Sequence, residues 1–262
     1  MMNEMGSSFE FTASAYAPRS QLRSGVQVAP KKKKKKGVEK MVTSEELDLT
    51  FQKVGNDFGF DNVSAEFSPF RDLKVKWQRT LDWASFQVSD YLAEAPIEVI
   101  EGIVKTIMSK IRGEEIGYPE ETIEWLTSHE FRTTNQQAYL ERSRMIALPM
   151  DGDDRLQESY ERLVEDGLIN EIEDLKLYWS KADGSKKMGE SSCLMRVAIL
   201  NPVLKDAPDT TLDYCLLKQL ANIAVGFNMN RESRTEEISN IMEACPEAIK
   251  AQNWLEANSI EV

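Results

Sequence analysis

The sequence predicts an α+β fold, and three observations support this class. Apolar residues recur at helical spacing after Pro96 and up to residue 111. Residues 73–77 and 83–88 alternate between apolar and polar side chains, as strands do. A second pair of strand-like segments, 175–179 and 194–200, precedes another apolar helical pattern. We therefore expect an N-terminal helix with antiparallel strands, a helical middle region, and a C-terminal domain in which a short antiparallel sheet packs on helices.

The composition divides the chain into a basic N-terminal tail and an acidic body. Residues 1–40 contain nine Lys or Arg and three acidic residues, a net charge of +6, and the whole chain carries −12, so residues 41–262 carry −18. The tail has few periodic apolar residues, which is typical of disorder. We expect a disordered tail over 1–42, an N-terminal α+β and helical region over 43–172, and a C-terminal domain over 173–262.

The first elements follow from local signals. Thr43 and Glu46 match a capping box and predict a helix over 44–56. The alternating segments 73–77 and 83–88 predict an antiparallel hairpin. The helix that starts after Pro96 is expected to end near Gly113.

The middle region is expected to be helical. Helices are predicted over 119–126 and 136–144, with the polar residues 133–135 as the junction between them. Asp151, Asp153 and Asp154 do not form an EF-hand loop, because Arg162 and Leu163 stand at the end of such a loop, where a glutamate is needed. The acidic cluster instead predicts the start of another helix.

The last third is expected to contain two strands and three helices. Strands are predicted over 175–179 and 194–200, with a turn at 183–185 between them. A helix starts near Thr210, a second follows Gly226, and a third covers 248–257.

Targeting and redox signals indicate a cytoplasmic protein with free thiols. The sequence has no run of about 18 apolar residues and no hydrophobic signal region, so we expect no membrane insertion and no secretion. Cys193, Cys215 and Cys245 are widely spaced and odd in number, which favours reduced, mostly buried thiols over a disulfide framework.

Six adjacent lysines stand at the end of the basic tail: Lys31, Lys32, Lys33, Lys34, Lys35 and Lys36. Such a run can contact phosphates without sequence preference, and it is also typical of nuclear-import signals. A solvated tail without a partner is the simplest interpretation. A weak nucleic-acid contact is the alternative, because the acidic body itself would repel phosphates.

The C-terminal third carries several motifs in a particular order. A strand with Trp179, a turn and a second strand precede the sequence Asn-Pro…Pro…Leu-Asp-Tyr-x-Leu-Leu at 201–217, and Pro-x-x-x-x-Ala-x-x-Trp-Leu follows at 246–255. This order resembles the SprT-like, or minigluzincin, zinc metallopeptidase domain of archaea and bacteria over about residues 173–256. Segments 70–77 and 88–96, together with parts of 130–144, also resemble archaeal proteins that carry this domain.

The resemblance aligns residues 218–222, Lys-Gln-Leu-Ala-Asn, with the His-Glu-x-x-His motif of these peptidases. In that motif two imidazoles bind Zn²⁺ and the glutamate takes a proton from the metal-bound water. Lys218 brings a cation without a lone pair, Gln219 cannot accept the proton, and Asn222 offers only a weak amide oxygen. The region 232–237, which matches the source of the third ligand, contains acids but no histidine. We therefore expect neither zinc nor a catalytic residue at these positions.

The helix around residues 218–222 also has a simpler interpretation. Its apolar residues can form an ordinary buried stripe that never had a connection with a metal: Leu216, Leu217, Leu220, Ile223 and Ala224. The motifs on either side of the helix favour the degenerate peptidase.

The first functional hypothesis is an inactive peptidase-like protein that acts as a binding or regulatory module. An extended peptide or protein partner would add as a strand along residues 194–200. Lys218 would then pair with Glu232, Glu236 or Glu237, because a partly buried lysine without a partner is costly.

Two alternatives stay open. The first is an active hydrolase whose nucleophile is Ser191, Ser192 or Cys193 and whose base is the only histidine, His129. The second is a nucleic-acid-associated scaffold tethered through the six lysines, since some SprT-like proteins act at protein bound to DNA.

Overall fold

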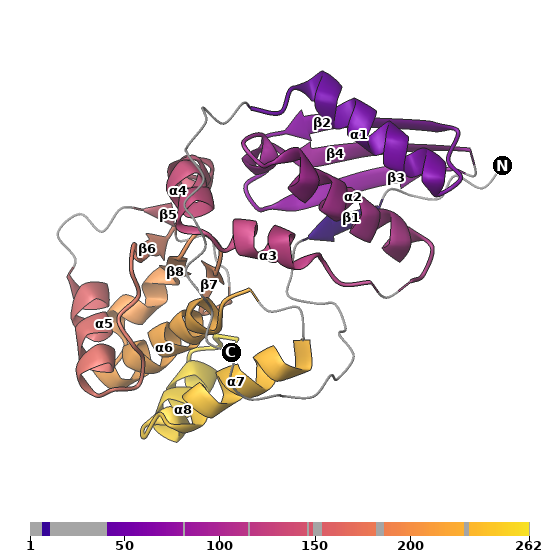
Figure 1. Cartoon of the computed structure of the whole chain (residues 1–262). Coiled ribbons are helices and arrows are strands. Elements are labelled where there is room, and N and C mark those ends of the chain that lie inside the picture. The colour runs from indigo at the N-terminus through magenta and orange to yellow at the C-terminus, as the bar shows by residue number, and fades with distance from the viewer. Residues whose placement is uncertain are drawn as a thin grey trace, which may run out of the picture. The chain divides into compact units, whose positions relative to one another are not determined.

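A computed structural model of the chain describes residues 7–10, 41–80, 82–114, 116–145, 147–148, 154–181, 186–227 and 231–261, with only the backbone for 7–10, 147–148 and 231–232. The chain divides into two units, Met1–Trp125 and Leu126–Val262. Each unit combines a small sheet with helices, so the predicted α+β class is confirmed (Figure 1).

The sheet of the first unit consists of β1 (Ser7–Glu10), β2 (Asn62–Ser68), β3 (Lys74–Arg79) and β4 (Trp83–Ser89), in the order β1-β3-β4-β2. The predicted antiparallel hairpin of β3 and β4 is confirmed, with Trp77 opposite Phe86. However, β2 runs parallel to β4. Strand β2 and its parallel pairing were not predicted; the pairing is parallel because the hairpin places β4 rather than β3 beside β2.

Part of the tail also differs from the prediction. Ser7–Glu10 form strand β1, which pairs antiparallel with β3, so the expected disorder over 1–42 is wrong for these residues. Strand β1 provides hydrogen-bond partners for backbone N–H and C=O groups at the edge of β3. Such pairing needs no apolar periodicity, so the composition of the tail did not predict this strand. Residues 1–6 and 11–40 lie outside the described residues.

Helices α1 (Ser44–Asp57) and α2 (Ile97–Ile111) cover the sheet of the first unit (Figure 1). The predicted capping box is present: Glu46 N donates to Thr43 Oγ1 at 3.2 Å, and Thr43 N donates to Glu46 Oε2 at 2.9 Å. In the core, Phe51 of α1 and Phe86 of β4 have ring centroids 4.9 Å apart. These contacts bury one apolar face of each helix against the sheet.

Helices α3 (Glu120–Leu126) and α4 (His129–Ser143) follow. The predicted junction at residues 133–135 lies inside α4, so that expectation is wrong. Ser128 caps the helix through a 3.0 Å bond from Phe131 N. Asn135 Nδ2 donates to Phe131 O at 2.9 Å, so this polar side chain bonds back onto the preceding turn instead of ending the helix.

The sheet of the second unit consists of β5 (Ala147–Leu148), β6 (Lys176–Ser180), β7 (Gly189–Ser192) and β8 (Val197–Leu200), in the order β5-β6-β8-β7. Only the last four residues of the strand predicted over 194–200 are in β8. The expected antiparallel sheet is also wrong, because β6 and β8 are parallel. The unforeseen strand β7 reverses the chain between them and pairs antiparallel with β8 at the sheet edge.

The turns that precede β6 and β8 are fixed by α4. Gln136 Nε2 donates to Asp174 O at 2.9 Å and to Met195 O at 2.7 Å. Asp174 has φ 57° and Arg196 has φ 49°, a region that non-glycine residues rarely adopt. One side chain therefore holds both of these turns.

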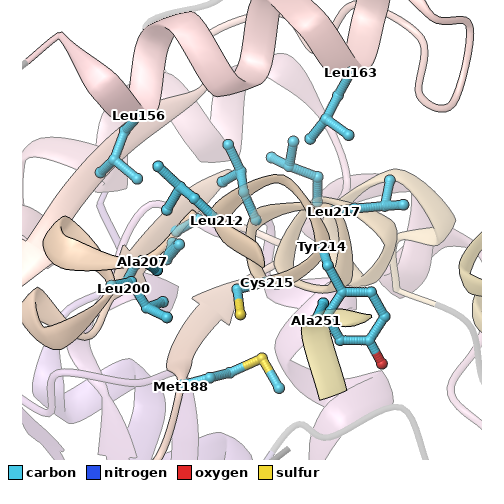
Figure 2. Close-up of a cluster of buried hydrophobic side chains, with 14 of the residues drawn as sticks. Leu156, Leu163, Met188, Leu200, Ala207, Leu212, Tyr214, Cys215, Leu217 and Ala251 are labelled. Atoms are coloured by element: carbon cyan, nitrogen blue, oxygen red, sulfur yellow. The ribbon is translucent and has the colours of Figure 1, made fainter. Parts of the chain in front are cut away.

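Helices α5 (Arg155–Glu165), α6 (Asp209–Val225), α7 (Arg231–Glu243) and α8 (Ala248–Ala257) complete the second unit. Helix α6 is central and packs against the other three helices and the sheet. Figure 2 shows Leu156 and Leu163 of α5 directed toward Leu212 and Leu217 of α6. The helices predicted from Thr210, after Gly226 and over 248–257 are confirmed.

The expected boundary between residues 172 and 173 falls inside the second unit. Helix α5 is joined to α6 by an ion pair, with Arg162 Nη2 and Asp213 Oδ1 2.7 Å apart, and Ser159 Oγ donates to the same oxygen at 2.6 Å. These bonds and the apolar contacts make α5 part of the same core as α6. The expectation of a domain that begins at residue 173 is therefore wrong.

Replacement of a core leucine tests the central position of α6. Leu216 is fully buried, whereas Ile249 of α8 is 75% exposed. Leu216→Ala should lower the free energy of unfolding by about 2–5 kcal/mol, because it removes apolar contacts and leaves a cavity. Ile249→Ala should change it by less than about 0.5 kcal/mol. Urea denaturation of both variants measures the difference, and equal effects would contradict this packing.

Candidate functional site

Gln219 and Asn222 lie on the side of α6 that meets β7, and Lys218 stands beside them. Gln219 is buried, while Lys218 and Asn222 are half-buried. Residues 218 and 222 are one helical turn apart and share a face. The helix ends at Gly226, whose φ of 73° suits a glycine after the last turn.

A chain of hydrogen bonds connects these amides to β7 and α7. Arg234 Nη2 donates to Asn222 Oδ1. Asn222 Nδ2 then donates to Ser191 Oγ at 2.8 Å, and Ser191 Oγ donates to Gln219 Oε1 at 2.9 Å. Because every donor points along the same direction, the bonds polarise one another and strengthen the chain. We call these four side chains the Arg234 network.

Arg234 also joins α7 to the end of α6. Its Nε donates to Gly226 O at 3.1 Å and its Nη2 donates to Asn222 O at 3.3 Å. These carbonyls belong to the last turn of α6 and to the residue after it, where helices leave carbonyls without intrahelical partners. The guanidinium therefore serves as a C-terminal cap, and its positive charge complements the negative end of the helix dipole.

Lys218 has no acidic partner among the described side chains. No salt bridge or hydrogen bond of the described part of the chain includes its ammonium, and the side chain of Glu232 is not described. The predicted pairing with Glu236 or Glu237 is therefore wrong. Glu237 instead accepts a 3.0 Å bond from Ser233 Oγ within α7. Burial lowers the pKa of Lys218, and the nearby Cys215 thiol opposes this shift.

The residues at this site do not fit a zinc ion. Neither Gln219 nor Asn222 is a usual zinc ligand, and each already uses its amide oxygen in the Arg234 network. The guanidinium places a positive charge directly on the Asn222 oxygen, where it would repel a divalent cation. No donor set for zinc exists here among the described residues.

In the described part of the chain, the hydroxyls of the candidate nucleophiles bond to amide groups and not to a base. Ser191 Oγ bonds to two amides, and Ser192 Oγ accepts a 3.4 Å bond from Met195 N. Burial raises the pKa of the Cys193 thiol, and the charge of Arg234 only partly offsets that effect. The structure describes no hydrogen bond between His129 and any of these three residues.

The three cysteines are unpaired, as predicted, and Cys215 and Cys245 are buried. Burial raises the pKa of Cys215 to about 12, so its thiol stays protonated near neutral pH.

His129 belongs to an exposed cluster with Glu173 and Asp174, whose ligand atoms lie within 4.8 Å of one another. The buried Arg132 occupies the same place, with Nη2 3.3 Å from Asp174 Oδ2 and 3.6 Å from Glu173 Oε2. Arg132 Nη2 also lies 3.1 Å from His129 Nδ1. Arg196 Nη1 also lies 3.6 Å from Glu173 Oε2, so two guanidiniums balance the two carboxylates, and the cluster fixes the turn before β6 instead of forming a metal site.

Strand β7 is an edge strand of the described sheet and lies beside the Arg234 network. The expected peptide position along 194–200 is wrong, because β8 lies between β6 and β7 and has no free edge. Just before β7, the chain pairs with its own C-terminal segment: Glu261 N donates to Lys186 O at 2.6 Å, and Met188 N donates to Glu261 O at 3.2 Å. Residues 189–192 follow this pairing directly and bond only to β8 among the described strands.

Other predictions fall outside the described region. The six lysines at 31–36 lie within residues 11–40, which the structure does not describe. Of the helices in the described ranges, none has both the length and the apolar character required to cross a lipid bilayer.

The Arg234 network makes a prediction about stability. Arg234→Met leaves the Asn222 and Gly226 oxygens without their charged donor, so it should lower the free energy of unfolding by about 1–3 kcal/mol. Arg144→Met removes an exposed guanidinium of the same unit and should have almost no effect. Urea denaturation compares the two. In a double-mutant cycle with Asn222→Ala, additive effects would contradict a direct bond between the two side chains.

No protein-family model matches this chain, and no curated protein and no solved structure matches it either. The resemblance to SprT-like peptidases therefore stays a prediction from the order of motifs. The Arg234 network and the edge strand β7 are the features from which a function can be inferred.

Proposed function

We propose that the second unit is a catalytically inactive, peptidase-like binding module that takes an extended peptide at the edge of β7. The Arg234 network carries this proposal. In this network Gln219 and Asn222, at the positions that the resemblance assigns to the general base and to one metal ligand, bond to hydroxyl and guanidinium groups of the chain itself.

The chemistry of these groups supports binding over catalysis. A hydrolase of the zinc type needs a basic group and metal-bound water. Glutamine and asparagine amides have no basic site near neutral pH, and arginine stays protonated. Ser191 Oγ donates a hydrogen bond to the Gln219 amide oxygen, which is too weak a base to take the proton and so activate the hydroxyl as a nucleophile. The four side chains of the Arg234 network are therefore polar, but none of them can activate water.

The position of β7 at the edge of the sheet favours an extended peptide as the partner. Antiparallel pairing with β8 uses alternate backbone groups of β7, and the others face away from β8. Exposed edges of this kind bind extended peptides by main-chain hydrogen bonds. The C-terminal segment pairs in this way at residues 186–188, immediately before β7. A short peptide would continue that pairing along residues 189–192.

A matched pair of peptides tests this mode of binding. Acetyl-Thr-Val-Gln-Val-Thr-amide should bind and should slow hydrogen exchange of backbone amides in residues 189–192. The same peptide with N-methylated valines should not bind, because it has lost the backbone donors. Calorimetry and hydrogen-exchange mass spectrometry measure the two effects.

The control for this experiment is strand β5 at the opposite edge, whose exchange should not change. The peptide should also be recovered intact after incubation with added Zn²⁺. Equal binding of the methylated peptide would contradict strand addition, and cleavage that a chelator stops would contradict the inactive site.

A further inference from the structure

A cavity of about 410 Å³ lies between helix α5 and strand β6 in the second unit. Gln157 and Tyr160 line it from α5, and three consecutive residues, Lys176, Leu177 and Tyr178, line it from β6. Successive side chains of a strand point to opposite faces of the sheet, so a cavity that touches all three lies against the edge of β6. Its volume falls in the range of pockets that hold small molecules.

The main chain of Leu177 faces this edge. On the opposite side of β6, Lys176 N donates to Arg196 O, the residue before β8, at 2.9 Å. Alternate residues of a strand bond to a parallel neighbour, so Lys176 and Tyr178 bond toward β8 and the N–H and C=O of Leu177 point away from it. There β5 pairs only with the last two residues of β6, and no described strand lies beside Leu177. Leu177 therefore offers a donor and an acceptor side by side.

Contacts at both ends limit the length of the cavity. At one end, β5 lies opposite Trp179. At the other end, Ile172 N donates to Tyr160 Oη at 2.7 Å and ties the chain before β6 to α5. The strand from Leu175 to Tyr178 spans about 13 Å, at about 3.3 Å per residue. This length leaves room for a compact molecule and not for a long strand.

The charged groups around the cavity nearly cancel. The Lys176 ammonium and the Glu171 carboxylate have opposite signs, and the Asp174 carboxylate already pairs with Arg132, with Nη2 and Oδ2 3.3 Å apart. A site without excess charge does not concentrate ions of either sign. A neutral ligand therefore suits the cavity better than a charged one.

The remaining wall is aromatic and apolar. Tyr160, Tyr178, Ile172 and Leu175 all line the cavity, and a flat ring placed there gains apolar and aromatic contacts. Burial raises the pKa of Tyr178, so its hydroxyl keeps its proton near neutral pH. The walls thus favour a flat molecule, and the edge of β6 favours one with a hydrogen-bond donor beside an acceptor.

We propose that this cavity binds a neutral nucleobase, or a similar planar heterocycle, through the main chain of Leu177. Nucleobases carry a donor beside an acceptor, such as the 6-amino group and N7 of adenine, and this pair matches the C=O and N–H of one extended residue. In the sheet, β8 lies between β6 and β7. The inference therefore goes beyond the proposed peptide binding at β7 and does not depend on it.

An NMR titration of the ¹⁵N-labelled full chain with adenine tests the proposal. Adenine should shift the amide signal of Leu177 and slow its hydrogen exchange, while residues 189–192 stay unchanged. Purine lacks the amino donor and should bind about three- to tenfold more weakly, as expected for the loss of one hydrogen bond. AMP should bind no more tightly than adenosine, because the cavity has no excess positive charge.

Two variants of α5 form a matched pair. Gln157→Trp places a large side chain at the cavity and should abolish the shift of Leu177, whereas Glu158→Trp changes an exposed residue outside the cavity and should preserve it. Position 157 is exposed as well, so both variants should fold, and urea denaturation checks this. Equal binding of adenine and purine, equal effects of the two variants, or no shift at Leu177 would overturn the proposal. Peptide binding at 189–192 is measured separately, so either proposal can fail alone.

Discussion

The bond from the Arg234 guanidinium to the Asn222 amide is the interaction on which the second unit depends. This bond attaches α7 to the last turn of α6, and the Asn222 amide in turn donates a hydrogen bond to Ser191 of β7. A neutral donor at position 234 would make weaker bonds, because charge-assisted bonds are about twice as strong as neutral ones. The chain's own cation therefore holds together three elements at the place where the family resemblance expects a metal ion.

Helix α6 contacts two different environments, an apolar core and a network of polar side chains. Its leucines face the core formed with α5 and α8, where Figure 2 shows Leu212 and Leu217. Leu216 and Leu220 are fully buried as well. Gln219 and Asn222 face β7, where each amide has a hydrogen-bond partner. A polar group that is buried without a partner costs free energy, so the network must be complete for the helix to pack here. Lys218 stands one helical turn before Asn222, and no described carboxylate pairs with its ammonium.

The sequence predicted the features that local signals determine. The capping box at Thr43, the helix that starts after Pro96 and the helix from Thr210 agree with the structure because caps and apolar periodicity act within a few residues. Strand β7 was missed because Gly-Glu-Ser-Ser has neither apolar alternation nor high strand propensity. The position of Gln219 and Asn222 was predicted, but the role of Arg234 was not, since a contact between residues twelve positions apart on two helices leaves no pattern in the sequence.

The central claim is that a guanidinium, not a metal ion, completes the polar site of α6. Anomalous X-ray diffraction at the zinc absorption edge, from crystals soaked in Zn²⁺, tests it most directly. We predict no anomalous peak near Gln219 and Asn222, with Arg234 still bonded to the Asn222 amide. A peak within about 2.0–2.2 Å of either amide oxygen, with Arg234 displaced, would contradict the claim.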